Sequence, residues 1–252
     1  MSEHSHYVYG LHAVQSVLER EADSVSKLWL EHSRRDAKAS KLIQLANDAG
    51  INLLRVSRDE LDKLAGETAN HQGIVALTRE TPAGNEKDLK QLLAGLNVPA
   101  FLLILDGVQD PHNLGACLRT ADAAGVHAVI APRDKATGLT ATVRKVACGA
   151  AETVPFIQVT NLARTMRDLQ QTGIWLIGTS LDTTQNLYQA DLTGPVAIVL
   201  GAEGKGLRRL TAEHCDSLVK LPMLGTVQSL NVSVSAGVCL YEAVRQRTGA
   251  TG

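Results

Sequence analysis

Residues 196–206 have the sequence VAIVLGAEGKG, in which a continuous apolar run passes directly into a turn that contains three glycines. A strand that is apolar at every position is typical of a parallel sheet covered on both faces by helices. The glycines let the backbone turn sharply and approach a ligand closely. This turn is neither the G-x-G-x-x-G pattern of dinucleotide sites nor a phosphate-binding P-loop, so taken alone it does not identify a ligand.

The same alternation of apolar strands and amphipathic helices begins at Phe101 and continues through the rest of the chain. It predicts a parallel α/β sheet with helices on both faces. Ligands of such sheets bind beyond the carboxyl ends of the strands, where the polar and glycine-rich stretches of this chain fall. The predicted strands are Phe101–Leu105, His127–Ala131, Ile174–Gly178, Val196–Leu200 and Leu218–Leu221, and the predicted helices are Leu114–Ala124, Leu139–Gly149, Leu162–Gln171, Leu207–His214 and Val232–Arg247.

The chain divides into three zones, and its 252 residues are enough for two modest domains. Residues 1–79 alternate short helical and strand patterns, which predicts a small α/β domain. Residues 80–99 form a polar connector with a short amphipathic helix at Leu89–Leu96, and residues 100–252 form the parallel-sheet domain. In the first zone the predicted helices are 11–18, 36–49 and 57–66, and the predicted strands are 25–30, 51–56 and 73–78.

Composition excludes several classes of protein. Apolar residues make up 44 % and charged residues 20 %, as in an ordinary globular protein. Four widely spaced cysteines without a C-x-x-C pair favour reduced thiols in a cytosolic protein over a disulfide framework or a zinc site. We find no apolar run of about 18 residues and no signal peptide, so we expect a cytoplasmic protein that is not inserted in a membrane.

The net charge of −1 does not point to nucleic acid, so any RNA contact has to come from local basic clusters. For each cluster taken alone, a solvated helix or loop face is the more common role. The clusters are Arg34-Arg35 with Lys38 and Lys41, Arg133 with Lys135, Arg144-Lys145, and Arg208-Arg209.

The sequence DGVQDPHNLGACLR, residues 106–119, follows the first strand of the large domain. Pro111 and Asn113 suit a turn that leads into a helix, with Asn113 as the predicted N-cap. Arg119 shares a helical face with Gly115 and Asp122, so it points toward the strand-end crevice or toward solvent. An ion pair with Asp122 on the surface explains the same spacing equally well.

Four small polar residues lie within seven positions after the last predicted strand: Ser229, Asn231, Ser233 and Ser235. Ser229 or Asn231 can serve as the N-cap of the following helix. Because such residues disfavour the helix interior slightly, the remaining ones indicate a second use for their polar atoms. Glu203, within the glycine-rich turn, either caps the next helix or holds a partner at the site.

The segments DPHNLGACLR, LGAEGKG and LPM…SLNVS, in this order and at these separations, closely resemble the three motifs of the SpoU (TrmH) family of RNA ribose methyltransferases. The opening YVYGLHAVQSVLE and the segment HQGIVAL resemble the small ribosomal-protein-like RNA-binding domain of bacterial members that methylate a guanosine 2′-hydroxyl in large-subunit ribosomal RNA. The resemblance therefore extends over the whole chain. Leu221 stands where relatives often have Ile, and Gln228 where close relatives often have a small or acidic residue.

The resemblance implies the SPOUT fold, a parallel sheet domain whose C-terminal segment threads a loop in a deep trefoil knot, a feature that is rare among proteins. It also implies a homodimer, ribosomal RNA as substrate, no metal, and S-adenosyl-L-methionine as methyl donor. Backbone groups at Gly201, Leu221 and Leu230 would hold the donor. The catalytic positions carried over from the family motifs are Asn113, Arg119, Glu203, Ser229 and Asn231.

The resemblance gives Arg119 a part in deprotonating the 2′-hydroxyl. A guanidinium stays protonated in proteins, so we interpret Arg119 as a group that stabilises alkoxide charge and clamps a neighbouring phosphate. Three other functions fit part of the pattern: a transfer-RNA ribose methyltransferase, a non-catalytic RNA-binding protein of ribosome assembly, and a Rossmann-type oxidoreductase. The missing dinucleotide fingerprint argues against the last of these, and the intact set of polar residues argues against the second.

Overall fold

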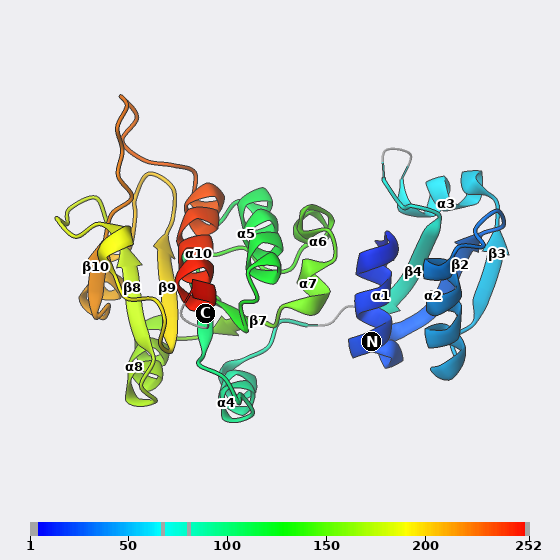
Figure 1. Cartoon of the computed structure of the whole chain (residues 1–252), viewed down its shortest axis with the longest axis horizontal. Coiled ribbons are helices and arrows are strands. Elements are labelled where there is room, and N and C mark those ends of the chain that lie inside the picture. Colours follow the sequence, from blue (N-terminus) through cyan, green and yellow to red (C-terminus); the bar gives the residue numbers. More distant parts are fainter. Residues whose placement is uncertain (1–4, 67–68, 80–81, 250–252) are drawn as a thin grey trace. The chain divides into compact units, whose positions relative to one another are not determined.

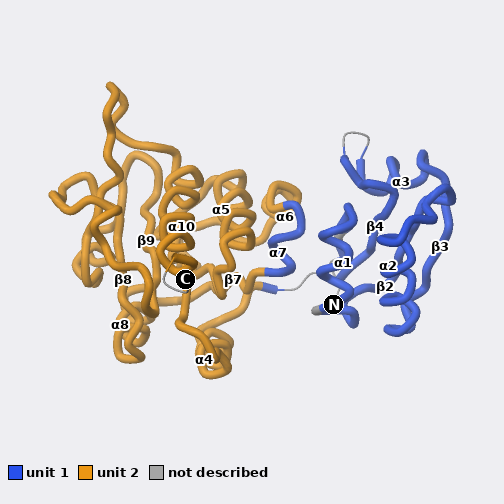
Figure 2. Tube along the Cα trace, viewed as in Figure 1, with its two compact units in different colours: residues 1–82, 148–153 blue, residues 83–147, 154–252 orange. Residues whose placement is uncertain are grey.

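The computed structural model describes residues 5–66, 69–79 and 82–249, and the chain divides into two compact units (Figure 2). Unit 1 comprises residues 1–82 and 148–153, and unit 2 comprises residues 83–147 and 154–252. Helix α4, Glu86–Ala94, belongs to unit 2, although the sequence analysis had placed it in the connector. Each unit has its own buried apolar cluster.

Unit 1 is built on a mixed four-stranded sheet in the order β1-β4-β2-β3 (Figure 1). The strands β2 and β3 are parallel, and β4 runs antiparallel to both of its neighbours. The helix predicted at 57–66 is α3, and it begins with a capping box in which the Ser57 and Glu60 side chains each accept from the other's backbone N–H. The elements are β1 Ser5–Tyr9, α1 Leu11–Arg20, η1 Ala22–Ser24, β2 Val25–Glu31, α2 Ala37–Asp48, β3 Leu53–Val56, α3 Arg58–Ala65 and β4 Ile74–Arg79, together with the short α7, Ala150–Thr153.

Unit 2 has a six-stranded sheet in the order β10-β8-β9-β5-β6-β7, and every pair in it is parallel, as the apolar strands predicted. Helices α4 and α8 cover one face, while α5 and α10 pack side by side on the other (Figure 1). The elements are β5 Phe101–Asp106, α5 Pro111–Ala123, β6 Ala128–Pro132, α6 Ala141–Ala147, β7 Phe156–Val159, α8 Leu162–Gln171, β8 Trp175–Thr179, η2 Leu187–Gln189, β9 Val196–Gly201, α9 Arg209–Glu213, β10 Ser217–Val219 and α10 Val232–Gly249.

Two features of this sheet differ from the sequence prediction. Strand β7 was not predicted, because its four residues are too few to give a clear pattern. Strand β10 ends at Val219 rather than Leu221, because Lys220 exchanges backbone hydrogen bonds with the Gln185–Leu187 segment. The knot implied by the family resemblance stays a prediction.

The last turn of α10 is fixed to the amino ends of β5 and β9 by Arg247. Its guanidinium lies 4.6 Å from the centre of the Phe101 ring and donates to the carbonyls of Leu192 (3.0 Å) and Ala100 (3.2 Å). It also donates to the carbonyls of Pro99 and Gly194. Burial lowers the pKa of Arg247 from its ordinary value. This half-buried cation therefore relies on carbonyl dipoles and an aromatic face to replace its hydration.

We expect Arg247→Ala to lower the free energy of unfolding by about 2 kcal/mol, because charge-assisted hydrogen bonds and a cation–π contact are lost. Urea denaturation of the full chain measures this change. The exposed Arg167 on α8 provides the control, and Arg167→Ala should leave the unfolding curve unchanged. Equal stability of the two variants would mean that the C-terminal turn of α10 does not depend on Arg247.

Candidate functional site

Three side chains from distant parts of unit 2 are hydrogen-bonded to one another at the carboxyl edge of the sheet. The Asn113 Nδ2 atom donates to Glu203 Oε1 at 3.1 Å. The Asn231 Nδ2 atom donates to Asn113 Oδ1 at 2.9 Å and also to Glu203 Oε1. The three predicted motifs therefore meet through one residue each, and we call these residues the Asn–Glu–Asn cluster.

Asn113 reaches Glu203 because it does not cap its own helix, which corrects the sequence prediction. The N-cap of α5 is Asp110, whose side chain accepts from the His112 backbone N–H at 2.9 Å. Pro111 occupies the first helical position, where its fixed φ angle and missing N–H are favourable. Asn113 thus lies inside the first turn, where it is 7 % exposed and its amide can turn toward Glu203.

Asn231 acts both as an N-cap and as a hydrogen-bonding group of the site, the two uses expected for the polar residues around it. Its Oδ1 atom accepts from the Ser233 backbone N–H at 2.8 Å and from the Ser233 hydroxyl at 2.6 Å, immediately before α10 begins. Its Nδ2 atom faces Asn113 and Glu203. One amide therefore both caps the last helix and joins the Asn–Glu–Asn cluster.

A cavity of about 150 Å³ adjoins this cluster. It is lined by residues of the glycine-rich turn and of the segment after β10, together with Ser180, Leu181 and Ser229. All three residues predicted to bind the donor line it, together with two of the predicted catalytic residues. Those five lining residues are Gly201, Leu221, Leu230, Glu203 and Ser229.

Gly201 is required by the closure of the glycine-rich turn. A Cβ atom at this position would lie 2.0 Å from the carbonyl carbon of Gly206. The turn is closed by the Gly206 N–H, which donates to the Ala202 carbonyl at 2.9 Å. Gly204 and Gly206 have φ angles of +72° and +62°, a left-handed conformation that favours glycine. The three glycines therefore shape the turn itself, and they also expose its backbone to the cavity.

Arg119 lies on α5, six residues after Asn113, and its side chain is exposed. One turn before Arg119, on the same side of α5, Gly115 is packed so closely on α6 that a Cβ atom there would lie 2.7 Å from Val146 Cβ. The turn of α5 that precedes Arg119 is thus held closely against α6. Arg119 takes no part in the hydrogen bonds that join the Asn–Glu–Asn cluster.

Asp106 also belongs to the site, although it is not among the residues predicted from the sequence. This residue ends β5, beside Gly201 in the sheet, and its carboxylate is bound by Arg208 just after the glycine-rich turn. Two features of the sequence indicate such a contact: a single acidic residue at the end of an otherwise apolar strand, and the arginines that follow the glycine-rich turn after β9.

Three of the four cysteines are unsuited to nucleophilic catalysis, and the fourth, Cys148, is exposed. Burial raises the pKa values of the Cys117 and Cys239 thiols to about 12, and burial followed by the nearby Asp216 and Asp106 charges raises that of Cys215 to about 12. The cavity lining contains no cysteine. Within the described residues, no group of His, Cys, Asp and Glu side chains could hold a metal ion, and no helix has the length and apolar character needed to cross a membrane.

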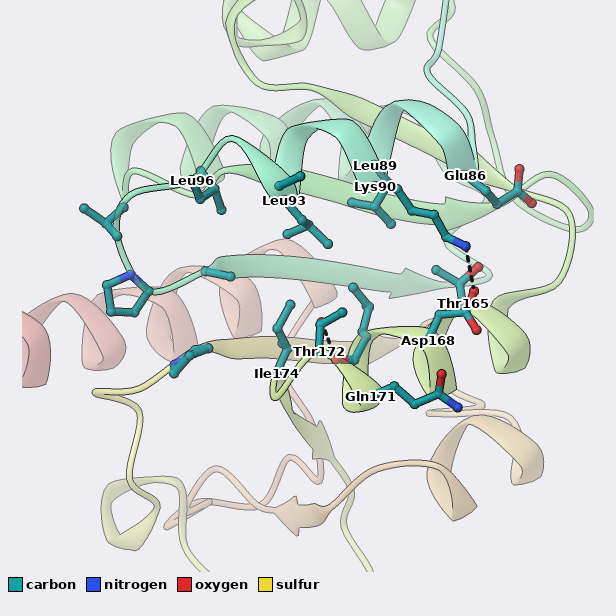
Figure 3. A pocket seen from close by; sticks show the side chains of 16 residues that line it. Glu86, Leu89, Lys90, Leu93, Leu96, Thr165, Asp168, Gln171, Thr172 and Ile174 are labelled. Atoms are coloured by element: carbon teal, nitrogen blue, oxygen red, sulfur yellow. Dashed lines mark hydrogen bonds and ion pairs between the residues drawn. The ribbon is translucent and has the colours of Figure 1, made fainter.

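A larger hollow of about 540 Å³ lies on unit 2 between α4 and α8 (Figure 3). Leu93 of α4 and Leu96, just after this helix, face Ile174 across it, and an ion pair of 3.5 Å joins Lys90 to Asp168. Pro99, Ala100 and Pro195 place it at the amino ends of β5 and β9. Because ligands of parallel sheets bind at the carboxyl ends, the smaller cavity is the candidate site.

These features define the class of protein: an α/β enzyme with a ligand cavity at the carboxyl edge of a parallel sheet. Residues 100–241 match the family model described as SpoU rRNA Methylase family, and residues 7–82 match the model described as RNA 2'-O ribose methyltransferase substrate binding. The chain belongs to the SpoU family of RNA methylases, which confirms the resemblance found in the sequence. The methyl donor of this family is S-adenosylmethionine.

Curated relatives match over nearly the full chain. A protein from Shewanella oneidensis is 57 % identical over 240 residues, covering 95 % of this chain and 97 % of the relative. One from Escherichia coli K12 is 53 % identical over 244 residues, covering 97 % and 100 %. Both are named 23S rRNA (guanosine-2'-O-)-methyltransferase RlmB.

Solved structures show the same fold. An RNA 2'-O ribose methyltransferase aligns with a TM-score of 0.71 at 27 % identity, covering 98 % of this chain and 90 % of that one. The SpoU methyltransferase AviRb from Streptomyces viridochromogenes, in complex with AdoMet, aligns with a TM-score of 0.75 at 24 % identity, covering 97 % and 91 %. The predicted α/β SpoU-type fold is thereby confirmed.

We expect Gly201→Ala to weaken S-adenosylmethionine binding roughly tenfold or more, because the added methyl group displaces the glycine-rich turn. Isothermal titration calorimetry measures this affinity. A Cβ atom at Gly194 would meet nothing within 4 Å, so Gly194→Ala is the control and should bind like the wild type. Wild-type affinity in Gly201→Ala would show that the turn does not form the donor site.

Proposed function

We propose that this protein transfers the methyl group of S-adenosylmethionine to the 2′-hydroxyl of a guanosine in large-subunit (23S) ribosomal RNA. The observation that carries this proposal is the Asn–Glu–Asn cluster, which lies beside a cavity lined by all three predicted donor-binding residues. The relatives of 53–57 % identity are 23S rRNA guanosine-2'-O-methyltransferases, and they match both units of this chain.

The cavity suits S-adenosylmethionine by its chemistry. Exposed backbone of Gly201, Gly204 and Gly206 offers hydrogen-bonding groups, while Leu181 and Met223 supply apolar surface for the nucleoside. The bound donor supplies a methyl group that its sulfonium already activates. The remaining task of the protein is to align the ribose oxygen and to manage its proton, and alignment alone can lower a barrier by several kcal/mol.

Glu203 is suited to orient the groups around the reacting ribose. Both amide donors of the cluster go to its Oε1 atom, and within the described part of the chain Oε2 receives no hydrogen bond. Oε2 can therefore accept from a hydroxyl or ammonium group of a ligand. Ser229 contributes a hydroxyl to the same cavity wall. We assign Asn113 and Asn231 to holding Glu203 in place.

We assign to Arg119 the role of stabilising the negative charge that develops on the ribose oxygen. Its guanidinium stays protonated, so it stabilises an alkoxide and binds the adjacent phosphate, which accepts the proton. The exposed position of Arg119 on α5 allows contact with a polynucleotide outside the cavity. A planar fork of donors is required for this double contact, which a lysine does not provide.

Ribosomal RNA is favoured over transfer RNA by unit 1. The substrate-binding model matches residues 7–82, which contain nearly all of this unit. A tRNA-modifying enzyme of Aquifex aeolicus, named A. aeolicus TrmH/SpoU in its structure, is 32 % identical but covers only 66 % of this chain. The extra unit therefore supports a ribosomal target, and a cytoplasmic location follows from such a target.

A homodimer is also part of the proposal, with α10 in its interface. Val234 and Tyr241 are each 51 % exposed and lie two helical turns apart on the same face. Arg119 lies on the neighbouring helix α5, which packs along α10. An apolar face beside a catalytic residue suits an interface between two copies of the chain.

Mapping of ribose methylation by reverse transcription in cells that lack this gene tests the activity. We expect one guanosine of the large-subunit RNA to lose its mark, wild-type protein to restore it, and Arg119→Lys to restore about a tenth or less of it, since the fork is lost. Purified Arg119→Lys should still bind the RNA. Unchanged ribosomal RNA with a missing transfer-RNA mark would favour the tRNA enzyme, and full restoration by Arg119→Lys would remove its assigned role.

Light scattering on the purified protein tests the dimer. We expect wild-type protein at twice the mass of one chain and Tyr241→Asp at the mass of a single chain, because a charge would enter an apolar interface. Leu210 is 52 % exposed and lies on α9, which packs against α8, so Leu210→Asp is the control and should stay dimeric. A dimeric Tyr241→Asp would place the interface elsewhere.

A further inference from the structure

Asp106 is a fully buried carboxylate at the end of an apolar strand. Its side chain is 0 % exposed, whereas that of its partner Arg208 is 46 % exposed. The Arg208 backbone N–H donates to Asp106 Oδ2 at 2.9 Å, and its Nε atom donates to Oδ1 at 2.6 Å. A third contact joins the Arg208 terminal nitrogen to Oδ1. A single residue thus satisfies both carboxylate oxygens.

This ion pair anchors both ends of the glycine-rich turn at one point. Gly201, where the turn begins, lies beside Asp106 in the parallel pairing of β9 with β5. Arg208, where the turn ends, binds the Asp106 carboxylate through main chain and side chain. The turn carries Glu203 and lines the cavity, so its placement relative to β5 is set by Asp106.

Asp106 also begins the connection to the other arm of the site. The chain leaves β5 at Asp106, and α5 starts at Pro111, which places Asn113 in its first turn. The 3.1 Å hydrogen bond from Asn113 to Glu203 therefore joins two segments that both depart from the same residue. A shift of the turn relative to β5 would change this bond directly.

Burying a carboxylate carries an unfavourable desolvation free energy that an apolar side chain does not have. Removing its charge from water costs several kcal/mol unless ideal partners replace the hydration, and apolar groups often serve stability as well. The other five residues of β5 are buried and apolar. A charge at the one position beside the turn is thus explained by geometry, because two guanidinium nitrogens hold Oδ1 while the Arg208 backbone N–H holds Oδ2, and together these contacts fix direction as well as distance.

We propose that Asp106 and Arg208 are positioning residues, which hold the Gly201–Arg208 turn in the geometry that binds the methyl donor and presents Glu203. The inference rests on the proposed function only in naming the donor as the ligand of the turn. Neither residue needs to touch the reacting groups. Lysine is a poor replacement for Arg208, because it cannot supply two parallel donors from a planar group.

The experiment compares Arg208→Ala and Arg208→Lys with Arg209→Ala in the full chain. Arg209 is the matched control, since it is the next residue, its side chain is 81 % exposed and it pairs with Glu213 on the same helix. Amide hydrogen exchange of residues 201–208 is measured in donor-free protein, S-adenosylmethionine affinity by calorimetry, and melting temperature by circular dichroism. Exchange in donor-free protein does not depend on any activity, so it separates this inference from the proposed function.

We expect Arg208→Ala to exchange faster within the turn and to bind the donor about tenfold more weakly, with an intermediate effect for Arg208→Lys. Its melting temperature should also fall, because the buried Asp106 charge loses its partner, whereas Arg209→Ala should match the wild type throughout. Unchanged exchange in the turn, or donor affinity within about twofold of wild type, would overturn the proposal.

Faster exchange spread evenly over the whole of unit 2, rather than concentrated in residues 201–208, would also overturn it, because the pair would then act on general stability. If Arg208→Ala does not fold, Arg208→Lys decides between the outcomes, since it keeps the charge beside Asp106. Wild-type behaviour of a folded Arg208→Lys protein would show that the fork geometry is unimportant and would sink the positioning role.

Discussion

The pairing of β5 with β9 is the contact on which the rest of unit 2 depends. Six residues pair in parallel register, from Phe101 beside Val196 to Asp106 beside Gly201. These strands are distant in sequence, and the loops that follow them carry Asn113 and Glu203. Because parallel strands end at the same edge, their pairing brings the two loops together without any direct attraction between the loops. The sheet thus places the two loops side by side, and the hydrogen bond between Asn113 and Glu203 then fixes their side chains relative to each other.

Much of this sheet could be predicted from sequence because buried parallel strands are nearly all apolar. Strands β5 and β9 were predicted to within one residue of the observed bounds. The four-residue β7 was not, since so short a segment has no reliable period. The position of Asn113 was also wrong, because both Asp110 and Asn113 are good capping residues and only tertiary contacts decide between them. The hydrogen bonds with Glu203 are such contacts, and they come from a segment 90 residues away.

The candidate site shows a similar division between local and long-range information. Family motifs supplied the residue types, and the structure brings Asn113, Glu203 and Asn231 into direct contact. The partnership of Asp106 with Arg208 had no local signature, since it spans 102 residues and depends on strand pairing. The site therefore combines two kinds of support: backbone of glycine-rich and strand-end segments around the cavity, and amide and carboxylate side chains beside it. The first kind tolerates changes of side chain that the second does not.

The buried thiols have a consequence for the chemical durability of a protein that handles a sulfonium compound. Such compounds alkylate thiolates, and Cys117 and Cys239 lie on α5 and α10, the two helices that begin at the site. With pKa values of about 12, these thiols are almost entirely neutral at physiological pH. Their burial among apolar side chains also keeps a bulky electrophile away. The packing that builds the core thus protects these two thiols from methylation by the donor.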